Sequence, residues 1–110
     1  MAKDPQSARV ALDLLILTVL DRRGPSHGYD LANLLHDWSA EAIQVEEGSL
    51  YPALHRMEET GWISATWTVT EFKRRARIYR ITRAGVRHLS RERDRWAIFA
   101  SGVGRILGHA

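Results

Sequence analysis

A strict two-residue alternation runs from Ile63 to Thr70, immediately after a stretch whose helical periodicity ends at Gly61. Alternation of this kind predicts a strand with one buried face and one wet face. A basic turn at residues 71–75 and a second strand at residues 76–81 would complete a hairpin. The apolar members of the first strand are Ile63, Ala65, Trp67 and Val69, and the polar members are Ser64, Thr66, Thr68 and Thr70. A helix followed directly by a hairpin with a cationic tip has the outline of a winged helix-turn-helix, a mainly α fold with a small β-hairpin.

The helix before this hairpin, at residues 47–61, has two unlike faces. Leu50, Leu54 and Met57 recur at helical spacing and form one apolar stripe. Gly61 is typical of the left-handed residue that ends a helix. The opposite face carries groups that can reach phosphates and base edges in a DNA major groove. These groups belong to Ser49, Tyr51, Pro52, His55 and Arg56, and Pro52 is expected within the first turn or so of the helix. For this helix alone, an ordinary solvated polar face remains the alternative.

The basic residues are concentrated in one part of the chain. Residues 72–96 contain ten Lys or Arg and two Asp or Glu, whereas the rest of the chain contains six and eleven. A cationic segment in an otherwise acidic protein suggests contact with a polyanion. On the hairpin, we predict contacts to phosphates or the minor groove from Lys73, Arg74, Arg75 and Arg77. The later arginines (Arg87, Arg91, Arg93 and Arg95) are better explained as a solvated helix face.

Two helices are predicted before the candidate DNA-reading helix. Ser7 can cap the first, over residues 8–22. This helix is apolar nearly all round between Leu14 and Leu20, so it needs cover on two sides. Ser26 can cap the second helix, over residues 27–38.

The last predicted helix is too long for the domain that precedes it. Thr82 can cap a helix that continues to about Leu107, which spans about 40 Å at 1.5 Å per residue. Its apolar stripe exceeds what so small a domain can cover, so a second copy of the chain is expected against it. Residues 8–81 are therefore predicted to form a winged helix-turn-helix DNA-binding domain, and residues 82–108 a dimerisation helix. The predicted interface residues are Leu14 and Leu17 from the first helix and Leu89, Trp96, Phe99, Val103 and Ile106 from the last.

Several blocks of the sequence resemble the PadR family of bacterial transcriptional regulators, in the family's order and at its spacing. The blocks are Leu12–Leu17, Gly24–Leu31, Gly48–Glu58, Gly61–Ile63, Arg74–Arg75 and Tyr79–Gly85, and together they span most of the chain. Two features depart from the family pattern. The wing tip has Phe72-Lys73 where many members have a glycine, and the C-terminal arm is short, as in the family's small subgroup.

The resemblance implies a sequence-specific DNA-binding transcriptional regulator. We expect a repressor that acts as a homodimer on palindromic double-stranded DNA. The alternative is a winged-helix module that uses the same surface to bind a protein. Some PadR-like regulators bind aromatic effectors at the dimer interface, which makes Trp96 a candidate ligand-binding residue here. The alternative for Trp96 is that it only fills the seam between the two copies.

Other functional classes find little support in the residues. The chain has no cysteine, which excludes disulfides, thiolate metal sites and cysteine nucleophiles. No histidine pair has the i, i+4 spacing of helical zinc sites, and there is no glycine-rich phosphate loop or Gly-x-Ser-x-Gly motif. Neither a metal, a cofactor nor an enzymatic activity is expected. The longest apolar run is far below the roughly 20 residues of a membrane span, and no cleaved signal is recognisable, so a cytoplasmic location is expected.

Overall fold

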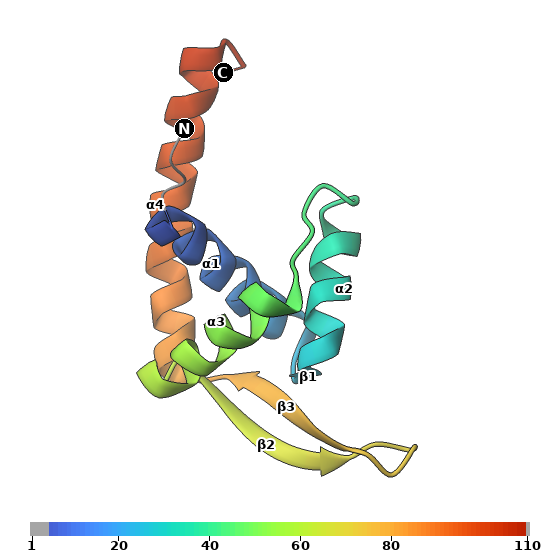
Figure 1. Ribbon diagram of the computed structural model, residues 1–110. Helices are drawn as coiled ribbons and strands as arrows, with labels where there is room; N and C mark the ends of the chain where they lie inside the picture. Colours follow the sequence, from blue (N-terminus) through green and yellow to red (C-terminus); the bar gives the residue numbers. More distant parts are fainter. Residues whose placement is uncertain (1–4, 110) are drawn as a thin grey trace.

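The helices and strands follow one another in the predicted order, with one added strand (Figure 1). The computed structural model describes the backbone of residues 5–109 and the side chains of residues 11–109. The elements are α1 (Pro5–Arg23), β1 (Ser26–His27), α2 (Gly28–Trp38), α3 (Glu47–Thr60), β2 (Ile63–Val69), β3 (Arg75–Ile81) and α4 (Arg83–Leu107). In Figure 1 the β2–β3 hairpin, which we call the wing, extends from one end of the body and α4 projects from the other. The predicted fold class, a winged helix-turn-helix with a long C-terminal helix, is confirmed.

The first helix begins earlier than predicted. α1 starts at Pro5, so Ser7 lies inside the helix and is not its cap. Proline is well suited to the first helical position, because its missing N–H would have no partner there in any case. The start of α1 is therefore set at Pro5, two residues before the serine that was the predicted cap.

The short strand β1 was not predicted. Ser26 and His27 pair antiparallel with Tyr79 and Ile78, respectively, so the sheet has the strand order β1-β3-β2. Ser26 is therefore not the cap of α2, and its Oγ donates a hydrogen bond to the carbonyl of Gly24 at 2.9 Å instead. A two-residue strand has too few residues to produce an alternation, so only its pairing with β3 reveals it.

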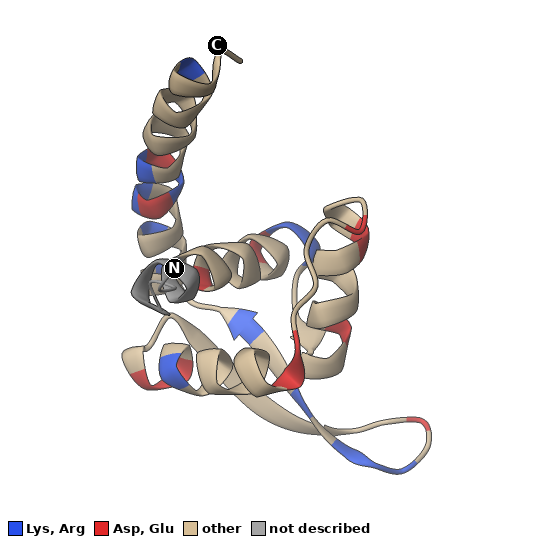
Figure 2. Cartoon of the chain, turned by 45° about the horizontal axis from the view of Figure 1, so that its top comes forward, with Lys and Arg blue, Asp and Glu red and all other residues tan. Residues whose placement is uncertain are grey.

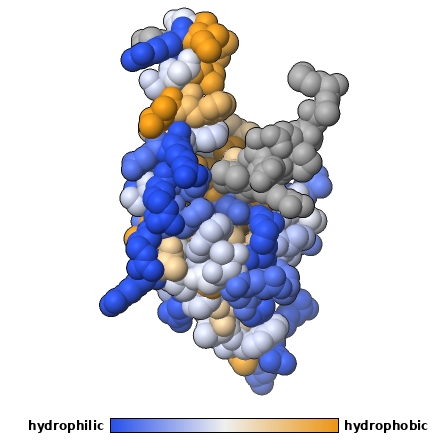
Figure 3. All heavy atoms as spheres, turned by 90° about the vertical axis from the view of Figure 1, so that its left-hand side faces the viewer, coloured by the Kyte–Doolittle hydropathy of each residue, from blue (hydrophilic) through white to orange (hydrophobic). Residues whose placement is uncertain are grey.

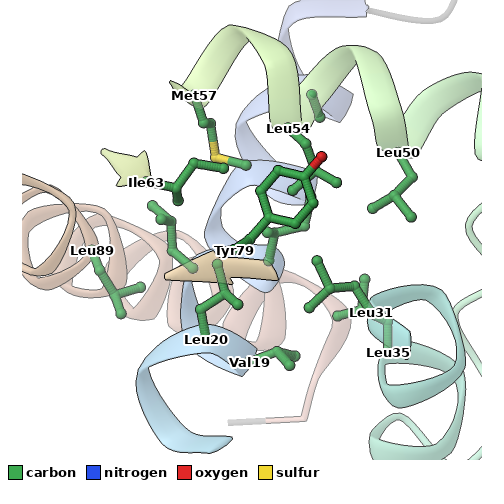
Figure 4. Packing of buried hydrophobic residues seen from close by; sticks show 13 residues of the cluster. Val19, Leu20, Leu31, Leu35, Leu50, Leu54, Met57, Ile63, Tyr79 and Leu89 are labelled. Atoms are coloured by element: carbon green, nitrogen blue, oxygen red, sulfur yellow. The ribbon is translucent and has the colours of Figure 1, made fainter. Parts of the chain in front are cut away.

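One hydrophobic core joins the helices to the base of the sheet (Figure 4). Every helix contributes side chains to it, and the sheet contributes Ile63 and Tyr79. The buried members are Ile16, Leu17, Val19, Leu20, Leu31, Leu35, Leu50, Ala53, Leu54, Met57, Ile63, Tyr79 and Leu89. Because α3 lies on this core with one face, the core fixes which of its side chains remain outside.

The wing has the predicted pair of strands but not the predicted burial. Ile63 pairs with Ile81 and Val69 pairs with Arg75, so the alternation does mark two paired strands. Burial, however, is confined to the base: Ile63 is 2% exposed, whereas Trp67 is 58% and Val69 66% exposed. The hairpin extends past the core (Figure 1), so its outer half has no apolar layer to cover it.

The start of α4 is fixed by a cap and by close contact with the α3–β2 junction. The Gly85 N–H donates to Thr82 Oγ1 at 3.0 Å, which confirms Thr82 as the cap. The Thr82 hydroxyl in turn donates to the Gly61 carbonyl at 2.6 Å. A Cβ atom at Gly85 would lie 2.1 Å from the Trp62 carbonyl oxygen, so only glycine permits this approach.

Beyond its first turns, α4 leaves the body and its side chains are largely exposed. The helix gives the molecule a long axis of 52 Å against 28 and 26 Å in the other two directions. It ends at Gly108, which has the left-handed φ of 85° that glycine adopts at helix ends. Within residues 5–109, none of the helices combines the length and apolarity that crossing a membrane demands.

Candidate nucleic-acid interface

Helix α3 is buried on one face and open on the other. The predicted apolar stripe of Leu50, Leu54 and Met57 faces the core, and Ala53 joins it. The open face includes Gly48, Ser49, Pro52, His55 and Glu59. The His55 Nε2 and Glu59 Oε1 atoms lie 2.8 Å apart one turn from each other, and both side chains are exposed. Glu59 was not among the predicted DNA contacts, although its spacing from Pro52 and His55 places it on this face.

Pro52 lies deeper in α3 than expected. The helix begins at Glu47, so Pro52 is in the second turn and not in the first. A proline here has no N–H for the carbonyl of Gly48, four residues earlier. Gly48 and Pro52 are both exposed, so this carbonyl can be hydrated or can accept a hydrogen bond from a ligand.

Arg56 is engaged within the protomer. Its Nη2 donates to Asp13 Oδ1 of α1 at 2.6 Å, and the Asp13 side chain is only 11% exposed. This ion pair lies on the flank of α3 that faces α1, so it holds the helix to the body. Arg56 was predicted to face DNA, and its side chain retains 36% exposure beside this ion pair.

Tyr51 lies on the other flank of α3, against the start of α2. A Cβ atom at Gly28 would be 2.9 Å from Tyr51 Cε1 and 3.4 Å from the Tyr79 ring, so the glycine lets the phenol come close. Burial, with a smaller contribution from the Glu47 carboxylate, raises the pKa of Tyr51. The Tyr51 hydroxyl therefore stays protonated at neutral pH and can donate a hydrogen bond.

Arg77 connects the wing to α3. Its Nη2 donates to Glu58 Oε2 at 2.7 Å, and the two side chains are 32% and 29% exposed. The guanidinium carbon also lies 5.4 Å from the Trp67 ring centroid and 5.7 Å from that of Tyr79, within cation–π distance. Arg77 Nε is buried without a hydrogen-bond partner among the described residues. The side chain is thus directed into the groove between wing and helix and not outward.

The three remaining predicted wing cations, Lys73, Arg74 and Arg75, are exposed. Figure 2 shows blue segments and one red segment at the wing tip, where Glu71 precedes these cations in the chain. The guanidinium carbon of Arg75 lies 4.5 Å from the Trp67 ring centroid, which limits where this cation can point.

A groove of about 480 Å³ separates the wing from α3 and the start of α2. Aromatic and basic side chains line it together, among them Tyr29, Tyr51, His55, Trp67 and Arg75. Tyr29 and Trp67 were not among the predicted site residues. The alternation predicted Trp67 on the buried face of the strand, but its side chain is 58% exposed. Tyr29 is 55% exposed, and its ring stacks on that of His27 at a centroid distance of 5.4 Å.

The predicted dimer residues fall into two groups. Leu17 and Leu89 are 0% and 2% exposed within the protomer core, so they offer no surface to a partner. Trp96, Phe99, Val103 and Ile106 are exposed on α4, and Ile98 and Leu107 extend the set. Figure 3 shows apolar side chains gathered toward the end of the helix, beyond a charged middle section. Leu14 is partly buried.

Trp96 lies where α4 leaves the body. It is 48% exposed, and its ring centroid is 5.7 Å from that of Phe99. An apolar cleft of about 430 Å³ opens beside it, with Leu14, Leu15 and Thr18 of α1 on the opposite side. Ile43, Ala11 and Arg93 complete the lining. The cleft is therefore lined both by Trp96, the predicted ligand-binding residue, and by Leu14, a predicted dimer-interface residue.

His88 couples α4 to the end of α3. Its imidazole stacks on the Trp62 ring at a centroid distance of 3.6 Å and an interplanar angle of 12°. Burial lowers the pKa of His88, partly opposed by the Glu92 carboxylate. The stack therefore contains a neutral imidazole at neutral pH. No group of three or more His, Cys, Asp or Glu that could hold a metal ion occurs within the part of the chain that the structure describes.

The known proteins that this chain resembles are transcriptional regulators. A family model with the description "Transcriptional regulator PadR-like family" matches residues 16–91. A transcriptional regulator from Clostridium thermocellum is similar in fold, with a TM-score of 0.80 and 27% identity, over 91% of this chain and 96% of that one. A PadR family transcriptional regulator from Eggerthella lenta is 30% identical, with a TM-score of 0.72, over 93% and 83% of the two chains. A PadR-like transcriptional regulator from Bacillus cereus is 26% identical, with a TM-score of 0.76, over 93% of this chain and 96% of that one. No curated protein matches the sequence at a significant level.

Proposed function

Because the chain belongs to the PadR-like family of transcriptional regulators, we propose that it is a sequence-specific repressor that binds a palindromic operator as a homodimer. One observation carries the proposal. The open face of α3 and the exposed cations of the wing lie at the same end of the molecule, away from the tip of α4 (Figures 1 and 2). A helix fits the major groove, while wing cations can neutralise phosphates.

The proposed contacts divide into two kinds. Ser49, Tyr51, Pro52 and His55 would lie in or beside the major groove. Lys73, Arg74 and Arg75 would hold phosphates or enter the minor groove. This division has a physical basis, because phosphate contacts set affinity and register whereas base contacts set sequence preference.

Arg56 and Arg77 have a different place in the proposal. Their ion pairs with Asp13 and Glu58, respectively, support a positioning role for each. Arg56 would fix α3 to α1, and Arg77 would fix the wing to α3. Each would then affect DNA binding by orienting the contacts that other residues make.

The homodimer would use the exposed apolar surface of α4. Phe99, Val103 and Ile106 are 61%, 37% and 88% exposed, and a second copy of the chain would cover this apolar surface, as in other symmetric homo-oligomers. A two-fold axis between the copies would present two α3 helices to DNA. Half-sites about one helical turn apart would follow from that symmetry.

An aromatic effector is the most specific part of the proposal. The cleft beside Trp96 is apolar, and Arg93 at its edge suits an anionic aromatic such as a phenolic acid. Such a molecule should quench Trp96 fluorescence and weaken operator binding in parallel. The Trp96→Phe chain is the matched control, since it should lose the quenching. If no planar aromatic changes either signal, Trp96 only fills the seam.

The test of DNA binding is a gel shift with the DNA upstream of the chain's own gene, followed by a salt titration. Replacing Arg74 and Arg75 with alanine should weaken binding to all sequences and reduce the salt slope by about 1 per lost contact. Arg105→Ala, at the far end of α4, is the matched control and should leave the slope unchanged. Unchanged affinity and slope in the double variant would refute the role of the wing. No DNA binding at all would favour a protein-binding winged-helix module.

A further inference from the structure

The tip of the wing is a closed, well-defined turn. The Lys73 N–H donates to the Thr70 carbonyl at 2.9 Å, and the Thr70 N–H donates to the Arg74 carbonyl at 2.8 Å. The Thr70 hydroxyl accepts a third bond, from the Arg74 N–H at 3.2 Å. Lys73 has a left-handed φ of 60°, which is the conformation of the third residue in a three-residue hairpin loop. These bonds fix the shape of the loop on which Phe72 sits.

Phe72 occupies this turn with its side chain in solvent. It is 80% exposed, although hairpin turns ordinarily carry small or polar residues. No core residue covers it, because the wing extends past the body (Figure 1). Lys73, Arg74 and Arg75 follow it directly, and Glu71 is the one acidic side chain of the turn. The tip therefore combines an aromatic ring with adjacent cations.

This combination suits the minor groove of DNA. Proteins that bind there commonly place Arg or Lys along the groove and insert an apolar side chain between two base pairs. The insertion partly unstacks the bases and bends the duplex toward the major groove. An anionic lipid surface could also take a ring flanked by cations. DNA is favoured here because α3, whose outer face is exposed, lies at the same end of the molecule as the wing (Figure 1).

We propose that Phe72 is a minor-groove wedge, which enters a base step beside the region contacted by α3 and bends the operator. The inference rests on the proposed DNA-binding function. Pyrimidine–purine steps unstack most easily, so one of these should lie under the wing tip. Sequence preference would then extend to a step whose base edges the protein does not touch.

The test uses duplexes that the unaltered chain enriches from a randomised library. In one set 2-aminopurine replaces a base at each step flanking the region protected by α3, and in another the two ends carry a fluorescent donor and acceptor. With the unaltered chain, 2-aminopurine fluorescence should rise at one step, and the ends should report a bend of about 20–90°. Phe72→Ala should remove both signals and weaken binding about tenfold, because the buried ring is lost.

Two further variants separate the wedge from general effects on the wing. Phe72→Leu keeps an apolar wedge and should retain most of the bend. Val69→Ala shortens another exposed apolar side chain of the wing, at the end of β2, and should change neither signal. Equal circular dichroism and unfolding midpoints would show that all three variants fold, as expected for exposed positions.

The outcomes distinguish the wedge from the DNA-binding function itself. If Phe72→Ala leaves the bend and the 2-aminopurine signal unchanged, the wedge is wrong and the DNA-binding function stands. If no duplex is enriched, the DNA-binding function is wrong and the wedge falls with it. Phe72-dependent binding to phosphatidylserine vesicles, without unstacking in DNA, would also overturn the wedge.

Discussion

Arg77 is the residue for which the structure makes the sharpest prediction. Its guanidinium carries an ion pair to Glu58 and two cation–π contacts, all with about a third of the side chain exposed. An exposed ion pair stabilises by up to about 1 kcal/mol, whereas breaking a buried one costs about 3–5 kcal/mol. Arg77 lies between these cases, so we take about 1.5 kcal/mol for the ion pair. Cation–π contacts to Trp67 and Tyr79 add roughly 0.5 kcal/mol in total at this exposure. Arg77→Ala should therefore destabilise the chain by about 2 kcal/mol.

A double-mutant cycle tests the origin of this stabilisation. Glu58→Ala should cost about 1.5 kcal/mol, and the double variant should cost about 1.5 kcal/mol less than the sum of the two single variants, because the ion pair is lost only once. Urea unfolding at one fixed protein concentration gives these values, since a dimer's stability depends on concentration. Additive costs, within about 0.3 kcal/mol, would refute the ion pair as the link between wing and α3.

DNA binding provides a second, independent measurement of the same residue. If Arg77 positions the wing, Arg77→Ala should weaken operator binding while the salt slope stays the same. Arg75→Ala, on the same strand but exposed, should reduce the slope by about 1. Equal loss of slope in both variants would show that Arg77 contacts phosphate after all.

Three further predictions concern other parts of the chain. Replacing Phe99 and Val103 together with aspartate should give a monomer or an insoluble chain, since it places charge on the proposed seam. Gel filtration of a soluble dimer with unchanged stability would contradict the seam. Lys73→Gly should raise the free energy of unfolding by about 0.5–1 kcal/mol in urea, because glycine relieves the left-handed φ of 60°. The third prediction is that His88 makes stability depend on pH, because burial lowers its folded pKa below the ordinary 6.5. As the pH falls, His88 is protonated in the unfolded chain before it is protonated in the folded chain. The stability that neutral His88 contributes is therefore fully present above about pH 6.5 and is lost as the pH falls through the folded pKa. His88→Gln should flatten the dependence between pH 7.5 and 5.5, and an equal slope in both proteins would refute the argument.

Features that depend on near neighbours in the chain follow from the sequence alone. Thr82 caps α4 and Gly61 ends α3 because each satisfies backbone groups within a few residues of itself. The alternation of residues 63–70 set the pairing of β2 with β3, since an alternating segment next to a turn has one nearby partner. The apolar stripe of α3 identified its buried face, and with it the open face that carries His55.

Which surfaces meet depends on how distant segments fold together. Trp67 alternates like a core residue but lies on the part of the hairpin that extends past the core, so it is exposed. The sequence identifies Arg77 as a wing cation, but in the folded chain its guanidinium donates a hydrogen bond to Glu58, which lies 19 positions earlier. Leu17 belongs to an all-round apolar helix, and its burial in the protomer removes it from the proposed seam. A periodic pattern states that a face is apolar or charged, but the folded arrangement of distant segments determines what covers that face.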